Sequence, residues 1–336
     1  MKKWLIVLAS LPLVFVMVAQ ENAPPVAQKK SRRPPPPGVS TPGVKREMAA
    51  ITPLAVFDAE GGAPDWQVLT EDSVWVANGP LNSVHRLDAR TNKMSATITV
   101  GKKPCSGLAA GFGSIWVPSC GDKTLGRIDP ATNTLIATLP IPPAESEGGI
   151  AVSEDAVWLV TDAAGKLSRI DPKTNTVAAL IDVPAGSASV VYGDGAVWVT
   201  TPAANMLTRV DAKTNKVTDS IPVGKGPRFE TFGAGAIWTL NQGDGTITRV
   251  DVKTRKVAAT IEAGLVGTGG EIGFGLGHVW ATLFQIPITE VDPASNTVVR
   301  QWTGDGGDSI RAGHGSVWLS NLRAHTVWRI DPEQLK

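Results

Sequence analysis

One stretch of the chain, residues 193–232, decides the fold, and it reads GDGAVWVTTPAANMLTRVDAKTNKVTDSIPVGKGPRFETF. Its glycine-rich start is typical of a hairpin turn. Three runs of β-branched or alternating apolar residues follow and predict strands at 196–201, 206–210 and 216–223. Residues 228–232 then begin the first strand of the next unit. Each unit of about forty residues therefore predicts four short strands.

This unit recurs seven times along the chain. Each copy carries a tryptophan followed by an aspartate: Trp75, Trp116, Trp158, Trp198, Trp238, Trp280 and Trp318, with Asp88, Asp129, Asp171, Asp211, Asp251, Asp292 and Asp331. A period near forty with short strands predicts an all-β, seven-bladed β-propeller with four-stranded antiparallel blades over residues 48–336. We interpret the aspartates as turn caps and the tryptophans as packing between blades, rather than as metal ligands or an aromatic cage.

The last repeat ends only five residues after Asp331 and lacks an outermost strand. Residues 51–58 lie upstream of the first unit and alternate as a strand does. We therefore expect this N-terminal strand to join the last blade, closing the ring and removing an exposed sheet edge.

The first 47 residues differ from the rest. Residues 1–20 combine a basic start with an apolar run and predict an export signal or an N-terminal anchor. Residues 21–47 predict a disordered, basic, proline-rich tether. Residues 1–47 carry eight Lys or Arg and two Glu in a chain of net charge +1, so the remainder is mildly acidic. A mildly acidic body argues against nucleic acid as a partner.

The repeat resembles the YVTN-type β-propeller family. The residues that carry the resemblance are VWVT at 197–200, RVDAKTNKV at 209–217 and SIPVGKGP at 220–227. The repeats are also similar to those of the streptogramin (virginiamycin B) lyases, which implies the same seven-bladed fold. Members of these families are mostly exported or surface-associated, and many have no assigned activity.

The lyase resemblance implies a Glu-x-His pair, a further histidine and a bound Mg²⁺. This chain has four histidines, and none lies two residues after a glutamate; Glu271 is followed by Gly273 at the required position. We expect His278 and His314 on the face away from the ligand, and His85 at an exposed strand position. The sequence therefore predicts no catalytic residue, no metal ligand and no cofactor, and leaves an enzyme uncertain.

Propeller ligands usually meet the face where the segments entering each blade and the loops joining its two middle strands converge. These variable loops on a rigid scaffold are where function tends to lie. We expect ligand-binding residues at this channel mouth, drawn from Glu147, Arg228, Glu230, Glu271, Arg311 and His325, with Asp65, Lys102, Lys103, Glu145, Asp308, Asp122 and others beside them.

Cys105 and Cys120 flank the turn Gly111-Phe112-Gly113 of the second unit. Pairing Ala110 with Ser114 and counting outward brings Cys105 opposite Ser119 or Cys120. We therefore predict a disulfide, which an exported protein can retain.

Taken together, these features predict an exported binding or interaction module of the cell envelope, periplasmic or extracellular. It would recognise a small ligand or a protein partner at the mouth, with no nucleic acid partner, and act as a monomer with membrane proximity through its N-terminal segment. The alternatives are a streptogramin-lyase-like or other enzyme with an unrecognised acid–base site on the same face, and a purely structural envelope protein.

Overall fold

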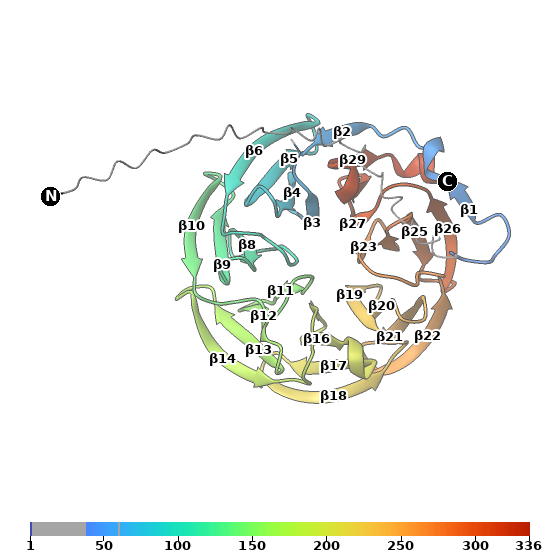
Figure 1. The fold of residues 1–336 in the computed structure, drawn as a ribbon. Helices are drawn as coiled ribbons and strands as arrows, with labels where there is room; N and C mark the ends of the chain where they lie inside the picture. Colours follow the sequence, from blue (N-terminus) through green and yellow to red (C-terminus); the bar gives the residue numbers. More distant parts are fainter. Residues whose placement is uncertain (2–37, 60) are drawn as a thin grey trace. The chain divides into compact units, whose positions relative to one another are not determined.

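The computed structural model describes residues 1, 38–59 and 61–336, and the propeller lies within the compact unit 35–336. Seven sheets are arranged in a ring around a central channel, as expected for a seven-bladed β-propeller (Figure 1). The innermost strands, whose neighbours pack side by side around the channel, are β3 (Pro64–Leu69), β7 (Ala109–Gly111), β11 (Ile150–Val152), β15 (Val190–Gly193), β19 (Pro227–Gly233), β23 (Glu271–Gly275) and β27 (Asp308–Gly313).

Outside each innermost strand lie three more strands, each antiparallel to its neighbour. The second strands are β4 (Ser73–Asn78), β8 (Ser114–Ser119), β12 (Val157–Asp162), β16 (Ala196–Thr201), β20 (Ala236–Asn241), β24 (His278–Leu283) and β28 (Ser316–Asn321). The third are β5 (Ser83–Asp88), β9 (Thr124–Asp129), β13 (Lys166–Asp171), β17 (Met206–Asp211), β21 (Thr246–Asp251), β25 (Ile286–Asp292) and β29 (Thr326–Ile330). The outermost are β6 (Lys93–Thr99), β10 (Thr134–Leu139), β14 (Thr176–Asp182), β18 (Lys216–Pro222), β22 (Lys256–Glu262), β26 (Thr297–Thr303) and β2 (Ala55–Asp58).

Short 3-10 helices complete the described elements: η1 (Met48–Ala50), η2 (Pro202–Ala204), η3 (Leu322–Ala324) and η4 (Pro332–Leu335). Among the described residues, no helix has the length and apolar character needed to cross a membrane.

The repeated tryptophans are structural, as expected. All seven lie on the second strands and are at most 2% exposed. Each indole N–H donates to an oxygen five residues earlier, in the hairpin between the innermost and second strands. In the fourth blade, Trp198 donates to the carbonyl of Gly193 at 3.2 Å. This hairpin places Asp194 and Gly195 at positive φ, the geometry of a type I′ turn, which matches the twist of the flanking strands.

The repeated aspartates cap the turn between the third and outermost strands. In the first blade, the carboxylate of Asp88 accepts the backbone N–H groups of Arg90 and Thr91 at 2.8 and 3.0 Å. These hydrogen bonds lower the pKa of Asp88, and Asn92 ends the turn in the left-handed region at φ 57°. The structural interpretation of the aspartates is therefore confirmed.

An arginine two residues before the aspartate provides a contact between blades that the repeat pattern did not predict. In four blades this arginine stacks on the tryptophan of its own sheet and donates to the Asx turn of the next blade. The four contacts join Arg86 to Asn133, Arg127 to Asn175, Arg249 to Asn296 and Arg329 to Asn92. The last of them crosses the junction between the chain's end and its first blade.

The chain closes the ring as predicted. Strand β2 pairs antiparallel with β29, so that the N-terminal strand is the outermost strand of the seventh blade. Phe57 of β2 is 5% exposed and packs on Trp318 with ring centroids 5.9 Å apart.

The predicted tether boundary at residue 47 is too late. β1 (Lys45–Glu47) pairs in parallel with β26 at the edge of the sixth blade (Figure 1). Val39 is buried, and its N–H donates to Gln301 Oε1 at 2.7 Å. Residues 38–47 are thus part of the propeller, because their backbone satisfies an otherwise open sheet edge. The predicted export signal and residues 21–37 of the tether lie outside the described residues.

Candidate binding site at the channel mouth

An aromatic pair lines the channel below its mouth. Trp66 of β3 and Phe229 of β19 come from the first and fifth blades and meet edge to face, with ring centroids 5.4 Å apart. Both side chains are buried, at 4% and 2% exposure. Each directly follows a charged residue, Asp65 and Arg228, so the charged side chains lie at the level of the mouth above an apolar floor. The two rings therefore give the channel an apolar lining below the charged residues of the mouth.

Four carboxyl groups converge on the mouth from four different blades. They belong to Asp65 on β3, Glu271 at the start of β23, Asp308 at the start of β27, and Glu147 in the segment between β10 and β11. Glu271 and Asp308 are buried, at 3% and 7% exposure, and the other two are half-buried. Their charges act on one another across the channel, since Glu147 is perturbed by both Asp308 and Glu271.

Burial raises the pKa of every one of these carboxyl groups, because it removes water from the charged form. For Asp65 the negative charges of Asp308 and Glu147 add to burial, and its pKa lies well above the ordinary range. The carboxyl groups of Asp65 and Asp308 are close enough to share a hydrogen bond, which favours the proton on Asp65. Burial raises the pKa of Glu147 to about 7, with Asp308 as the next largest cause.

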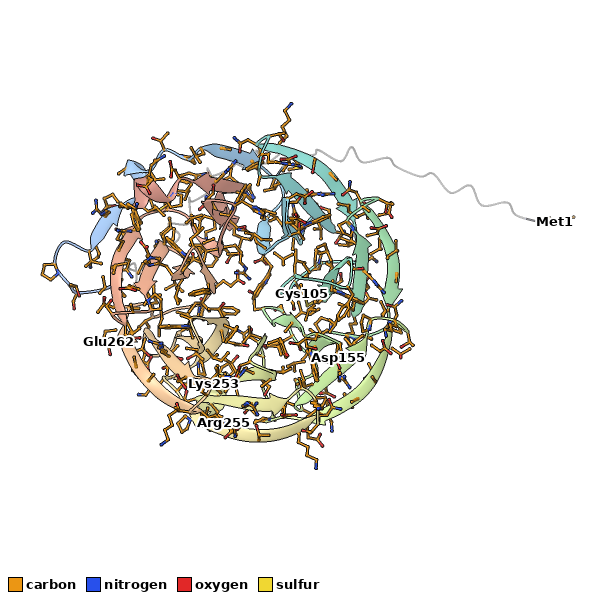
Figure 2. All side chains as sticks on the ribbon, turned by 180° about the vertical axis from the view of Figure 1, so that it is seen from behind. Met1, Cys105, Asp155, Lys253, Arg255 and Glu262 are labelled. Carbon is orange, nitrogen blue, oxygen red and sulfur yellow. A yellow bond between two sulfur atoms is a disulfide. The ribbon has the colours of Figure 1, made fainter. Side chains whose placement is uncertain are left out.

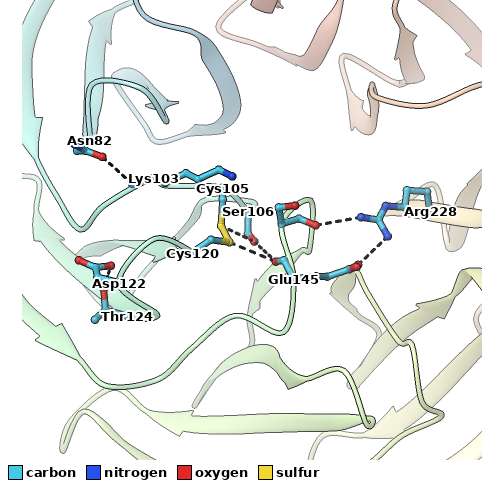
Figure 3. Close-up of a disulfide and its surroundings, with 10 residues drawn as sticks. Asn82, Lys103, Cys105, Ser106, Cys120, Asp122, Thr124, Glu145 and Arg228 are labelled. Carbon is cyan, nitrogen blue, oxygen red and sulfur yellow. Dashed lines mark hydrogen bonds and ion pairs between the residues drawn. A yellow bond between two sulfur atoms is a disulfide. The ribbon is translucent and has the colours of Figure 1, made fainter.

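Two arginines face the carboxylates, and both are engaged within the protein. Arg311 pairs with Glu271, whose other oxygen accepts from Ser309. Arg228 reaches from the fifth blade to the segment entering the third, where it donates to Glu145 Oε1 at 2.8 Å and to the carbonyl of Ser146 at 3.1 Å (Figure 3). Arg228 therefore ties two blades together across the mouth.

A cavity of about 420 Å³ opens beside this group. It is formed where the crossover segments and the middle-strand loops meet, which is the face expected from the sequence. Its lining residues are Ala63, Asp65, Gly79, Pro80, Lys103, Pro104, Cys105, Ser146, Glu147 and Leu322. Two of the converging carboxylates, Asp65 and Glu147, thus face a space large enough for a small molecule.

The cavity wall is braced by a disulfide between Cys105 and Cys120, as predicted, with the Cα atoms 5.8 Å apart. Cys105 lies near the centre of the ring (Figure 2). Its carbonyl accepts the backbone N–H of Glu147 at 2.8 Å. The sulfur of Cys120 contacts the carbonyl of Glu145 (Figure 3). The disulfide therefore positions the segment that carries Glu147.

The expected register of this hairpin was off by one residue. Gly111 pairs with Ser114, rather than Ala110 with Ser114, because the turn consists of only two residues, Phe112 and Gly113, both at positive φ. The resulting ladder pairs Pro104 with Ser119, which leaves the two cysteines adjacent.

Glu147 has a backbone conformation that disfavours a side chain. Its φ is +67°, in the left-handed region that glycine adopts most readily. For other residues this region costs about 1–2 kcal/mol. A half-buried glutamate held in this conformation, at the wall of a cavity, is the kind of local strain that points to a functional site.

Glu230 lies apart from the other carboxylates. It is 7% exposed, and neither carboxylate oxygen has a hydrogen-bond partner among the described residues. Ser189 and Thr200 of the fourth blade lie nearby without reaching good hydrogen-bond geometry. Burial raises the pKa of Glu230 to about 8. The equivalent strand position holds an apolar residue in four other blades, namely Ile150, Val190, Ile272 and Ile310.

Of the six predicted residues, the structure thus brings Glu147, Arg228, Glu271 and Arg311 together at the mouth. Glu230 lies just below, at the junction of the fourth and fifth blades. His325 lies at the rim, where its ring contacts the carbonyl of Gly62 and holds the crossover into β3. Asp65 and Asp308, which were expected beside them from the sequence, interact with the same carboxyl groups, whereas the Trp66–Phe229 contact was not predicted.

The remaining histidines are away from the mouth. His278 pairs with Glu290 at 3.2 Å, and His314 occupies a hairpin turn. The expectation that His85 is exposed was wrong: its side chain is 3% exposed. His85 is paired with Val76 on β4, so the two side chains lie on the same face of the sheet, and that face is buried at Val76.

Comparisons with known proteins agree with this architecture. A family model described as "Repeat of unknown function (DUF6923)" matches residues 142–268. No curated protein matches the chain. A streptogramin B lyase structure is 19% identical, with a TM-score of 0.69, and the match covers 82% of this chain and 96% of that one.

Two structures of virginiamycin B lyase from Staphylococcus aureus are similar in the same way. One has a TM-score of 0.69 at 15% identity, and the other, a catalytically inactive variant with quinupristin, has 0.68 at 14% identity; each match covers 82% of this chain and 98% of that chain. The chain is a seven-bladed β-propeller repeat protein related in fold to virginiamycin B lyase. Likeness at this level of identity concerns the fold alone.

Proposed function

We propose that this propeller is an exported binding module of the cell envelope that takes a small ligand at its channel mouth. The observation that carries the proposal is the cavity of about 420 Å³ lined by Asp65 and Glu147. A volume in the range of small-molecule pockets, with polar groups converging on it, favours a small ligand over a protein partner. The strained backbone of Glu147 supports the same assignment.

Export rests on two features. The apolar run at residues 4–19 follows a basic start, and the disulfide between Cys105 and Cys120 suits an oxidising compartment such as the periplasm or the cell exterior. Cell fractionation of the native protein, with its mature N-terminus determined by mass spectrometry, tests this part. Recovery of the full-length protein from the cytoplasm would contradict it.

Binding is tested by a thermal-shift screen of small molecules on the wild type, Glu147→Gln and Glu262→Gln. Glu262 is exposed on the outer rim and serves as the matched control (Figure 2). The proposal expects compounds that stabilise the wild type and the control equally and lose their effect on Glu147→Gln. If no compound distinguishes Glu147→Gln from the control, the mouth is not the binding site.

A second candidate, an enzyme with an acid–base site on the same face, is favoured by one observation. Glu147, whose pKa is raised to about 7, and the paired Asp65 and Asp308 offer groups that can exchange protons near neutral pH beside a cavity. Turnover of a screening hit, lost in Glu147→Gln, would support an enzyme. Stoichiometric binding without any product supports the binding module. Removing metal with a chelator discriminates further, because a lyase-like site needs its ion and a binding scaffold does not.

A further inference from the structure

The charges at the mouth do not balance within the protein. Arg311 forms an ion pair with Glu271 and donates a hydrogen bond to the carbonyl of Ile310. Arg228 forms an ion pair with Glu145 and donates a hydrogen bond to the carbonyl of Ser146. Arg228 still acts on Glu147, and Arg323 acts on Asp308, but Asp65, Asp308 and Glu147 form no ion pair with a cationic side chain among the described residues.

Lys103 is the cationic residue in the cavity lining, and it does not balance the three carboxyl groups. Its side chain is exposed at the opening, where water and salt screen its charge. It forms no ion pair among the described residues. Three carboxyl groups that repel one another in a partly dry site are stabilised by any cation that enters.

The described floor also leaves polar atoms unsatisfied. The indole N–H of Trp66, which is 4% exposed and follows Asp65 directly, has no hydrogen-bond partner, and neither oxygen of Glu230 has one. A native protein rarely leaves buried polar atoms without partners, and each costs about 1–3 kcal/mol. Neither residue lines the cavity, so these atoms describe the floor beside it, and the ligand class is argued from the carboxyl groups and walls that do line it.

The lining restricts the kind of cation. Ala63, Pro80, Pro104 and Leu322 give the cavity apolar walls, which suit an apolar body. No aromatic ring belongs to the part of the lining that the structure describes, so the arrangement that binds quaternary ammonium groups is absent there. Among the described residues, no group of three or more His, Cys, Asp or Glu side chains is arranged to hold a metal ion.

We propose that the mouth cavity binds a protonated primary or secondary amine attached to an apolar body, with the ammonium group donating to the carboxylate of Glu147 and to a carboxyl oxygen of Asp65. Charge-assisted hydrogen bonds of this kind are about twice as strong as neutral ones. The apolar body lies against the proline and leucine wall. This inference rests on the proposed binding function and names the chemical class of its ligand.

The test uses four compounds that share an indole body: tryptamine, its alcohol analogue tryptophol, indole-3-propionate and N,N,N-trimethyltryptammonium. Isothermal titration calorimetry at pH 8 measures each with the wild type. We expect tryptamine to bind with a Kd below about 1 mM and at least about tenfold more tightly than the other three. Equal or tighter binding of the alcohol or the carboxylate overturns the proposal. Equal binding of the trimethyl compound would show that the ammonium group does not bind by donating hydrogen bonds.

Two isosteric variants, Glu147→Gln and Asp65→Asn, locate the site. Each should weaken tryptamine binding by about tenfold or more, as expected for losing one charge-assisted hydrogen bond. Glu262→Gln, on the outer rim, should bind as the wild type does. Unchanged affinity in both mouth variants contradicts the proposal, and circular dichroism confirms that each variant is folded.

Affinity should also depend on pH. A carboxyl group with a pKa of about 7 is mostly protonated at pH 5.5 and mostly ionised at pH 8, and its ionised fraction rises about 30-fold between them. Because the cation binds the ionised form, the affinity of the wild type for tryptamine should rise between pH 5.5 and 8. In Glu147→Gln this increase should be much smaller. The charged groups that act on Glu147 or share the cavity are Asp65, Asp308, Glu271, Glu145, Arg228 and Lys103. Affinity that is flat or falls with pH contradicts the proposal.

Two further outcomes separate this inference from the function on which it rests. If calcium ions displace tryptamine, and calcium binding itself requires Glu147, then the site binds a hard metal ion and the amine proposal is wrong. If neutral or anionic compounds from the screen bind at the mouth while tryptamine does not, the amine proposal fails and the binding function stands. If no compound binds there, both fail.

Discussion

Replacing Glu230 with glutamine should stabilise the protein, and increasingly so as the pH rises. Glu230 is buried without a hydrogen-bond partner for either oxygen among the described residues, and burial raises its pKa from 4.5 to about 8. Below pH 4.5 the carboxyl group is neutral in both the folded and the unfolded chain. Between pH 4.5 and 8 the folded protein holds a proton that the unfolded chain releases. Stability therefore falls as the pH rises through this window.

The size of the effect follows from the two pKa values. Each unit of difference corresponds to about 1.4 kcal/mol, so Glu230 lowers stability by about 3 kcal/mol at pH 7 and by close to nothing at pH 4. Glutamine has nearly the same shape and no charge. Glu230→Gln should recover most of this loss at pH 7, and more at pH 8.

The assay is guanidinium denaturation of the wild type and Glu230→Gln at pH 4.5, 7 and 8, with Glu262→Gln as the control because Glu262 is exposed. The difference in unfolding free energy should grow with pH for Glu230→Gln and stay near zero for the control. An equal gain at all three pH values would attribute the effect to packing. No gain at pH 8 would refute the idea that Glu230 is desolvated and unpaired.

Three other substitutions test separate parts of the structure. Changing both Cys105 and Cys120 to serine should cost about 3 kcal/mol of stability in a denaturation assay, as expected for a loop of 15 residues. It should also weaken ligand binding measured by calorimetry, because the disulfide positions the Glu147 segment. Unchanged binding would contradict that positioning role. Glu147→Gly should raise stability by about 1 kcal/mol while abolishing binding, because glycine adopts φ +67° without strain; a loss of stability in denaturation would argue against backbone strain. Phe57→Ala should cost about 3–5 kcal/mol, because Phe57 packs on Trp318 where the ring closes; a change below about 1 kcal/mol in the same assay would show that this closure contributes little.

The sequence predicted the fold well because the repeat averages over seven copies. A single hairpin such as Asp194-Gly195 is a weak signal, but the same spacing between Trp198 and Asp211 returns in every unit. Ring closure was predictable for the same reason, since a missing strand at one end and a spare strand at the other must pair. The structure of residues 38–47 was not predictable, because β1 pairs in parallel with a strand about 255 residues away and leaves no local pattern.

The site was predictable only in part. The repeat identifies residues that depart from it: Arg311 lies opposite Trp318, where other blades carry small or apolar residues such as Ala151 and Gly273. Aligning the innermost strands in this way would also have set Glu230 apart from the mouth residues. The repeat pattern does not predict which side chains from blades on opposite sides of the channel come into contact. The contact between Trp66 and Phe229, which forms the floor, joins blades that are not neighbours and follows from no local rule.

Whether the mouth cavity is a ligand site can be decided by a crystal structure of the protein with the most stabilising compound from the screen. We expect the compound in the cavity bounded by Asp65, Glu147 and Cys105, in hydrogen-bond contact with at least one of the two carboxylates. A compound bound elsewhere on the propeller, with only water in that cavity, would contradict the assignment of the mouth as the binding site.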